Sequence, residues 1–184
     1  MTSPRRIYRI YHYLGQNAET VRDFCLAQGQ PVSGTVERLI AKDRAKLLRR
    51  FGEEMAELCG VLDGTHDDSY LMEASQTWYW ASLYAVTGGA AWEDLGQDDL
   101  PRLAVQSGIG STEELRRAVT RLVELGPEQV KPAKPFLLWW AADRLYRQAT
   151  PIDNQWSPDQ IMAADLADMK KRPYLEPVLR AVPE

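Results

Sequence analysis

Four glutamates are the residues of this chain whose types and spacing point most clearly to chemistry. Glu53, Glu54 and Glu57 stand in the segment EEMAE, and Glu73 stands in the later segment LMEAS. On a helix, Glu54 and Glu57 would lie one turn apart, and Glu53 and Glu57 would be i,i+4 neighbours. A short antiparallel hairpin would bring Glu73, near the start of a second helix, beside the end of the first. Because carboxylates this close repel one another and Mg²⁺ prefers oxygen ligands, the pattern predicts a metal site between two helices.

The same glutamates have a second interpretation, since a run of charge on a helix usually forms a solvated face. The turn between the two acidic segments, DGTHDD, contains His66, which we interpret as an exposed turn residue. The sequence alone leaves the solvated face and the metal site open as alternatives.

Three consecutive aromatic residues, Trp78, Tyr79 and Trp80, follow Glu73 in the second segment. On a helix they must point in different directions, because each residue rotates the chain by about 100°. At least one of them therefore leaves the core. Packing in the core or between subunits is the first interpretation of these side chains, and a base-stacking surface is the second.

The segments that must position these residues have the periodicity of helices. Apolar residues at spacings of three and four predict a long amphipathic helix over about 35–62, and a second helix is expected over about 69–87, ending at Gly88. Gly52, inside the first of these, indicates close packing against a neighbour. The segment IYRIYHY fits a helix or a strand, and no other stretch alternates like a strand. Further helices are expected over 17–28, 111–126, 133–149 and 157–172. The predicted fold class is all-α, with residues 1–184 in one domain.

Composition excludes several classes of function. The chain has 184 residues with 22 Lys and Arg against 26 Asp and Glu, and this net charge of −4 argues against a nucleic-acid-binding protein. Its apolar runs are far shorter than the ~20 residues that span a bilayer, so no membrane partner is expected. The N-terminus lacks the continuous apolar stretch of a signal peptide. Cys25 and Cys59 have no metal-ligand spacing, and we expect buried free thiols in a reducing cytoplasm.

Two motifs together suggest a family. The segment RRFGEEMAEL, followed by LMEASQTWYWASLYAVTGGAAWEDL, resembles the all-α nucleotide pyrophosphatases, namely the MazG-like proteins and phosphoribosyl-ATP pyrophosphatase. The family signature is G-E-E-x-x-E on one helix and E-x-x-D on the next, and the resemblance covers about residues 36–100. Gln76 stands where the family has Asp, and about 101–184 form an extension beyond the compact enzymes. The resemblance implies a MazG-like helical bundle with extra C-terminal helices.

The resemblance also implies an activity: the hydrolysis of an α–β phosphoanhydride, which releases pyrophosphate from a nucleoside triphosphate or from phosphoribosyl-ATP. It implies Mg²⁺, with Mn²⁺ as an alternative ion. By analogy the metal ligands are Glu54, Glu57 and Glu73, with Gln76 as a weak ligand, and Glu53 orients or deprotonates the attacking water.

Positive charge is needed to bind the substrate phosphates. The candidates are Lys46, Arg49 and Arg50, which precede the glutamates on the expected first helix. Their alternative role is in intrahelical ion pairs on a wet face, worth about 0.3–0.5 kcal/mol each. The resembled family commonly forms homodimers or tetramers, so the resemblance implies a homo-oligomer, and a cytoplasmic location is expected. The alternative function is that of a catalytically decayed helical module that senses nucleotides or binds another protein, with activity lost at Gln76.

Overall fold

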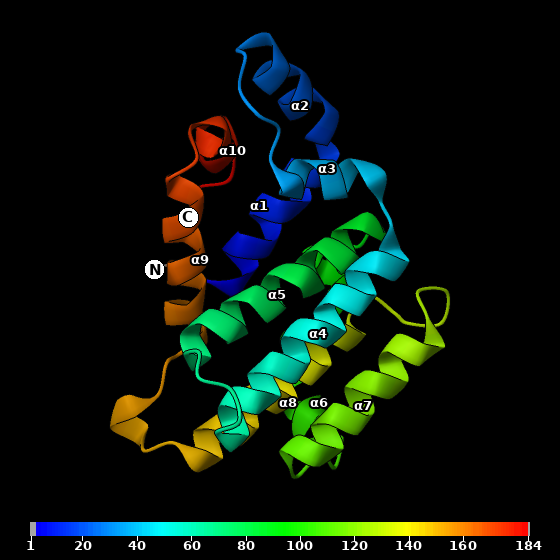
Figure 1. The fold of residues 1–184 in the computed structure, drawn as a ribbon, viewed down its shortest axis with the longest axis vertical. Helices are drawn as coiled ribbons and strands as arrows, with labels where there is room; N and C mark the ends of the chain where they lie inside the picture. Colours follow the sequence, from blue (N-terminus) through cyan, green and yellow to red (C-terminus); the bar gives the residue numbers. More distant parts are fainter. Residues whose placement is uncertain (1–2, 184) are drawn as a thin grey trace.

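Residues 3–183 are described by a computed structural model, and all their regular structure is helical (Figure 1). The all-α fold class is therefore confirmed, with no strand in this part of the chain. No helix of residues 3–183 combines the length and apolar composition needed to cross a membrane. The α-helices are α1 (Pro4–Gln16), α2 (Ala18–Ala27), α3 (Gly34–Ala41), α4 (Arg44–Asp63), α5 (Tyr70–Thr87), α6 (Leu100–Gln106), α7 (Thr112–Leu125), α8 (Lys134–Ala149), α9 (Pro158–Lys170) and α10 (Glu176–Ala181). Short 3₁₀ helices are η1 (Trp92–Leu95), η2 (Ile152–Asn154) and η3 (Pro173–Leu175).

Helices α4 and α5 form the central hairpin, and they lie side by side in Figure 1. The left-handed Gly64 ends α4, and the Ser69 side chain caps α5 by accepting a hydrogen bond from the backbone N–H of Met72. Phe51 of α4 and Trp78 of α5 are fully buried in the core of the protein. The expected turn between two acidic helices is confirmed.

The remaining helices cover this hairpin. Helix α7 packs against α4, α8 packs against both hairpin helices, and α1 and α9 pack against α5. A Cβ atom at Gly52 would lie 2.7 Å from Cγ2 of Val123, so the absence of a side chain lets α7 approach α4 closely. The close packing predicted at this glycine is confirmed.

The prediction of one long helix over about 35–62 is wrong, because the helical structure is interrupted between α3 and α4. Lys42 adopts the left-handed conformation with φ 51°, and the Asp43 carboxylate accepts a hydrogen bond of 2.9 Å from the Lys46 N–H as the cap of α4. Asp is among the residue types favoured at this capping position. Because of this interruption, α3 does not continue along the axis of α4, and Arg38 of α3 lines a pocket beside α4 and α5.

The N-terminal segment IYRIYHY, which fits either a helix or a strand, lies in α1. Ser3 caps this helix, and its buried residues recur at the helical spacing of three and four: Ile7, Tyr8, Ile10, Tyr11 and Leu14. Cys25 and Cys59 are buried and free, as predicted from the absence of metal-ligand spacing.

Candidate functional site

Two of the four predicted glutamates are buried where α4 faces α5. Glu54 is 2% exposed and Glu73 is 1% exposed. Arg50 donates a hydrogen bond of 2.6 Å from Nη2 to Oε1 of Glu54. The Oε2 atoms of both glutamates are buried and lack a hydrogen-bond partner within residues 3–183. A buried carboxylate is costly unless its charge and its lone pairs are satisfied. Arg50 balances the charge of Glu54, whereas Oε2 of Glu73 has no partner in this part of the chain, so Glu73 in particular calls for a cation or a proton.

The electrostatics of the pair agree with that requirement. Burial raises the pKa of Glu73 from its ordinary value to about 7, and the nearby charges of Glu57 and Glu54 raise it further. Burial and Glu57 also raise the pKa of Glu54, while the positive charge of Arg50 opposes the rise. A divalent cation among these side chains would favour their ionised forms, because an opposite charge at short range lowers a carboxyl pKa.

Glu57 and His66 complete a cluster around Glu73. Each of these three side chains offers a ligand atom, and the three atoms lie within 4.8 Å of one another. His66 Nε2 is 2.9 Å from Oδ2 of Asp68 and 3.8 Å from Oε1 of Glu73. The His66 side chain is 33% exposed, so it lies half-buried beside the carboxylates rather than free in solvent, as an exposed turn residue would. The sequence feature that could have indicated this position of His66 was its place in the turn that joins the two acidic helices.

A pocket of about 540 Å³ opens beside Glu54. Among the sequence-predicted site residues, Glu54, Arg50 and Gln76 line it. The pocket walls come from α1, α3, α4, α5, α9 and η3, so helices of the C-terminal extension close one side of it. This volume and its charged walls suit a polar small molecule.

The other predicted residues, Glu57 and Glu73 among them, are outside the lining of this pocket. Glu53 has a side chain that is 44% exposed and forms an ion pair with Arg50, outside the lining of the pockets found in residues 3–183. Lys46 lines a second, smaller pocket of about 220 Å³ next to Arg38 and Trp80. Arg49 is exposed and lines neither of these two pockets of the described chain. The structure thus brings Arg50, and not Arg49, to the edge of the buried carboxylates.

The aromatic run divides between the core and the pocket. Trp78 is fully buried, with ring centroids 4.7 Å from Phe136 and 4.9 Å from Trp139. Tyr79 is half-buried and lines the pocket, as does Trp80, which is only 6% exposed. The guanidinium groups of Arg38 and Arg50 lie 5.0 and 5.1 Å from the centre of the Trp80 ring.

The far wall of the pocket carries its own charged groups. The Tyr11 hydroxyl lies 2.9 Å from Oδ2 of Asp165 and donates to that carboxylate, and burial raises the pKa of Asp165 to about 7. Arg172 donates a hydrogen bond of 2.6 Å to Oδ2 of Asp168. Arg38 and Asp165 were not predicted as site residues, because α3 and α9 reach the pocket only through tertiary packing. Arg172 follows the end of α9, where the sequence favoured an interaction with the helix dipole over a phosphate role.

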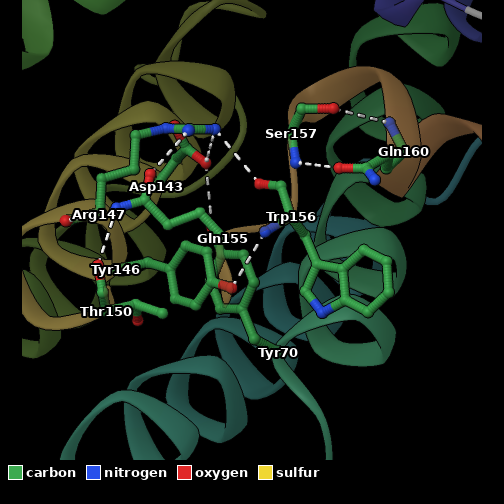
Figure 2. A network of polar contacts seen from close by, with 9 residues as sticks. All are labelled: Tyr70, Asp143, Tyr146, Arg147, Thr150, Gln155, Trp156, Ser157 and Gln160. Carbon is green, nitrogen blue, oxygen red and sulfur yellow. Dashed lines mark hydrogen bonds and ion pairs between the residues drawn. The ribbon is translucent and has the colours of Figure 1, made fainter. Parts of the chain in front are cut away.

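A polar network fixes the start of α5 to α8 (Figure 2). Asp143 is buried, and it accepts hydrogen bonds from Arg147 Nε at 2.7 Å and from the Tyr70 hydroxyl at 3.3 Å. The Tyr70 ring stacks on Tyr146 with centroids 3.5 Å apart. Since Tyr70 begins α5, this network also holds the helix turn that carries Glu73.

The same network holds the connection from α8 to α9 (Figure 2). Gln155 donates to the carbonyls of Arg147 and Thr150 at 2.9 and 2.8 Å, and the Trp156 N–H donates to the Tyr146 hydroxyl at 3.1 Å. At the end of this connection Ser157 caps α9. The connection therefore places α9, and with it Asp165, against the pocket.

A scan against protein-family models and searches of curated proteins and of solved structures found no match to this chain.

Proposed function

We propose that this protein is a metal-dependent nucleotide pyrophosphohydrolase with a MazG-like helical bundle. One observation carries the proposal: Glu54 and Glu73 are buried on facing helices with unsatisfied oxygens, and Glu54 lines a pocket that also presents arginines. Buried carboxylates with free lone pairs suit a hard divalent cation, and the arginines suit phosphate oxygens. The cleaved bond is the α–β phosphoanhydride of a nucleoside triphosphate or of phosphoribosyl-ATP.

The position of each residue in the site suggests its role. Glu54, Glu57 and Glu73 would hold Mg²⁺, which supplies charge neutralisation to the leaving pyrophosphate. Arg50 and Arg38, which both lie at the pocket, would bind phosphate oxygens. The half-buried face of Tyr79 offers a surface for the nucleobase.

Glu53 and Gln76 have supporting roles in this proposal. Glu53 is held by Arg50 at the exposed side of α4, outside the lining of the pocket, and would orient the attacking water from that side. Gln76 lines the pocket and offers an amide oxygen where the resembled family has a carboxylate. The family also leads us to expect a homodimer or tetramer, with the nucleotide as the small-molecule partner.

The competing function is a decayed module that keeps the fold and binds a nucleotide or a protein without turnover. Gln76 favours this alternative, because an amide contributes no charge to a metal site. The buried and unsatisfied Glu73 favours the enzyme, because a site that no longer holds a cation gains nothing from a buried charge.

Pyrophosphate release separates the two functions. The assay uses Mg²⁺ and Mn²⁺ with a panel of ribo- and deoxynucleoside triphosphates and phosphoribosyl-ATP. We expect turnover on part of the panel and a loss of at least about 100-fold in Glu54→Gln, because a ligand of the ion is removed. Glu124→Gln, an exposed glutamate of α7, is the matched control and should keep full activity. If the wild-type protein releases no pyrophosphate from any substrate of the panel, the enzyme proposal is overturned.

A further inference from the structure

We propose that His66 is a direct ligand of the metal centre and makes it prefer a divalent transition ion, represented by Mn²⁺, over Mg²⁺. The inference rests on the metal centre of the proposed function. It goes further because the motif residues that suggested this centre supply only carboxylate and amide oxygens, whereas the turn DGTHDD supplies an imidazole nitrogen.

The distances within the cluster suit one ion. An octahedral ion with bonds of about 2.1 Å holds its ligand atoms about 3 to 4 Å apart. His66 Nε2 and Glu73 Oε1 are already 3.8 Å apart. The ligand atoms of Glu57, His66 and Glu73 all lie within 4.8 Å of one another. Small movements of these side chains would therefore bring all three atoms to bonding distance from one ion.

An independent observation indicates that the protein alone does not satisfy this cluster. Glu73 is 1% exposed, and its Oε2 has no hydrogen-bond partner among the described residues 3–183. The other oxygen of this carboxylate, Oε1, is the one that lies near His66. A buried group of this kind normally has a partner, so its absence points to a bound species.

His66 is held in place by the backbone rather than by chance packing. The N–H groups of Thr65 and His66 donate to the Gly60 carbonyl at 2.8 and 3.1 Å. Gly60 lies in α4 one helical turn after Glu57, and a Cβ there would be 2.7 Å from the Cβ of His66. The glycine therefore permits the turn to place the imidazole against α4, on the level of the carboxylates.

The ligand set determines which ion is favoured. Imidazole nitrogen binds divalent transition ions better than Mg²⁺, while carboxylate oxygens accept both Mg²⁺ and Mn²⁺. A mixed set of glutamates and one histidine therefore shifts the preference toward Mn²⁺. Oδ2 of Asp68 lies 2.9 Å from Nε2 of His66, but this nitrogen has no hydrogen-bond partner within residues 3–183, so an ion would not have to break a hydrogen bond to reach it.

The test is electron paramagnetic resonance of Mn²⁺ bound to the full chain, with spin-echo detection of coupled nitrogen. We expect saturable Mn²⁺ binding and a ¹⁴N modulation, which ¹⁵N-histidine labelling converts to ¹⁵N without any variant. In His66→Gln the modulation should vanish, and the Mn²⁺ affinity should fall about 10-fold. The Mg²⁺ affinity of this variant should change less than about 2-fold, since Mg²⁺ prefers oxygen ligands. His12→Gln, at the only other histidine of the sequence, should retain the wild-type signal.

The outcomes separate this inference from the proposed function. Saturable Mn²⁺ binding without histidine coupling, or coupling that survives His66→Gln, overturns the role of His66 and leaves the carboxylate centre standing. The absence of saturable binding of both Mn²⁺ and Mg²⁺ overturns the metal centre itself and the inference with it.

Discussion

Arg50 donates a hydrogen bond of 2.6 Å to the buried Glu54, and its guanidinium also lies 5.1 Å from the centre of the Trp80 ring. One cation thus sits at the boundary between the buried carboxylates and the pocket. A metal ion bound by Glu54 would compete with Arg50 for that carboxylate, which leaves the guanidinium available for a phosphate oxygen. This relationship distinguishes Arg50 from the neighbouring positive residues of α4.

Replacing Arg50 should therefore weaken substrate binding. We expect Arg50→Gln to raise KM by about 10-fold or more, because a hydrogen bond to a charged group contributes about 1.5–3 kcal/mol. Initial rates over a range of substrate concentrations measure this effect. Arg49→Gln removes the same charge from an exposed side chain outside the pocket, and its KM should stay within about 2-fold of wild type. Equal effects of the two variants would contradict this assignment of the phosphate site.

Divalent cations should stabilise the protein through Glu73. At 100 times the dissociation constant, a bound ion adds about 2.7 kcal/mol to the free energy of unfolding. For a domain of this size that corresponds to a rise of roughly 5–10 °C in the melting temperature. Calorimetry with and without the ion measures the rise, and a chelator should reverse it.

The matched variants are Glu73→Gln, which removes one buried charge, and Glu124→Gln, which removes an exposed one. We expect the cation to stabilise the second variant and not the first. In the absence of the ion, Glu73→Gln should be at least as stable as wild type, because it removes a buried carboxylate surrounded by like charges. The same cation effect in both variants would exclude Glu73 from the centre.

The hairpin and several helices were predictable because their signals are local. Helices α5, α7 and α9 lie within the ranges expected from the sequence, and the assumed hairpin implied that Glu73 would lie near the glutamates of α4. The break after α3 was missed because no glycine or proline marks it: Lys42 takes a positive φ, and Asp43 was the one available signal.

The pocket could not be predicted in the same way. Its far wall comes from Asp165 and Arg172, which are distant in sequence from the motif and reach it through the packing of α9 against α1 and α5. Two neighbouring residues of α2 illustrate the same limit: the side chain of Phe24 is 49% exposed, whereas Cys25 is buried. Periodicity identifies a face, whereas burial depends on which helix covers it.

The half-buried carboxyl of Asp165 should make stability depend on pH. Its pKa is raised from an ordinary value of 3.8 to about 7, mainly by burial, so the folded state holds this proton more tightly than the unfolded state. A carboxyl of this kind costs no stability below pH 4, and its unfavourable ionisation lowers stability progressively as the pH rises from about 4 to 7.

We expect Asp165→Asn to flatten that decrease, since the amide does not ionise and can still accept from the Tyr11 hydroxyl. Urea unfolding between pH 5 and 7.5 measures the slope for both proteins. Asp98→Asn, at an exposed loop position, is the control and should keep the wild-type slope. Parallel pH profiles for wild type and Asp165→Asn would show that Asp165 ionises freely in the folded protein.

The close approach of α4 and α7 gives a prediction that is independent of activity. In Gly52→Ala the new methyl would meet Cγ2 of Val123 at 2.7 Å, closer than carbon atoms normally approach. We expect a loss of about 1–3 kcal/mol in the free energy of unfolding, although alanine favours the helix by about 1 kcal/mol. Val123→Ala alone should also destabilise, because it removes packing atoms. In the double variant the two losses should be less than additive, since the shortened side chain makes room for the added methyl. Strict additivity in chemical unfolding would place the cost of Gly52→Ala elsewhere than in this contact.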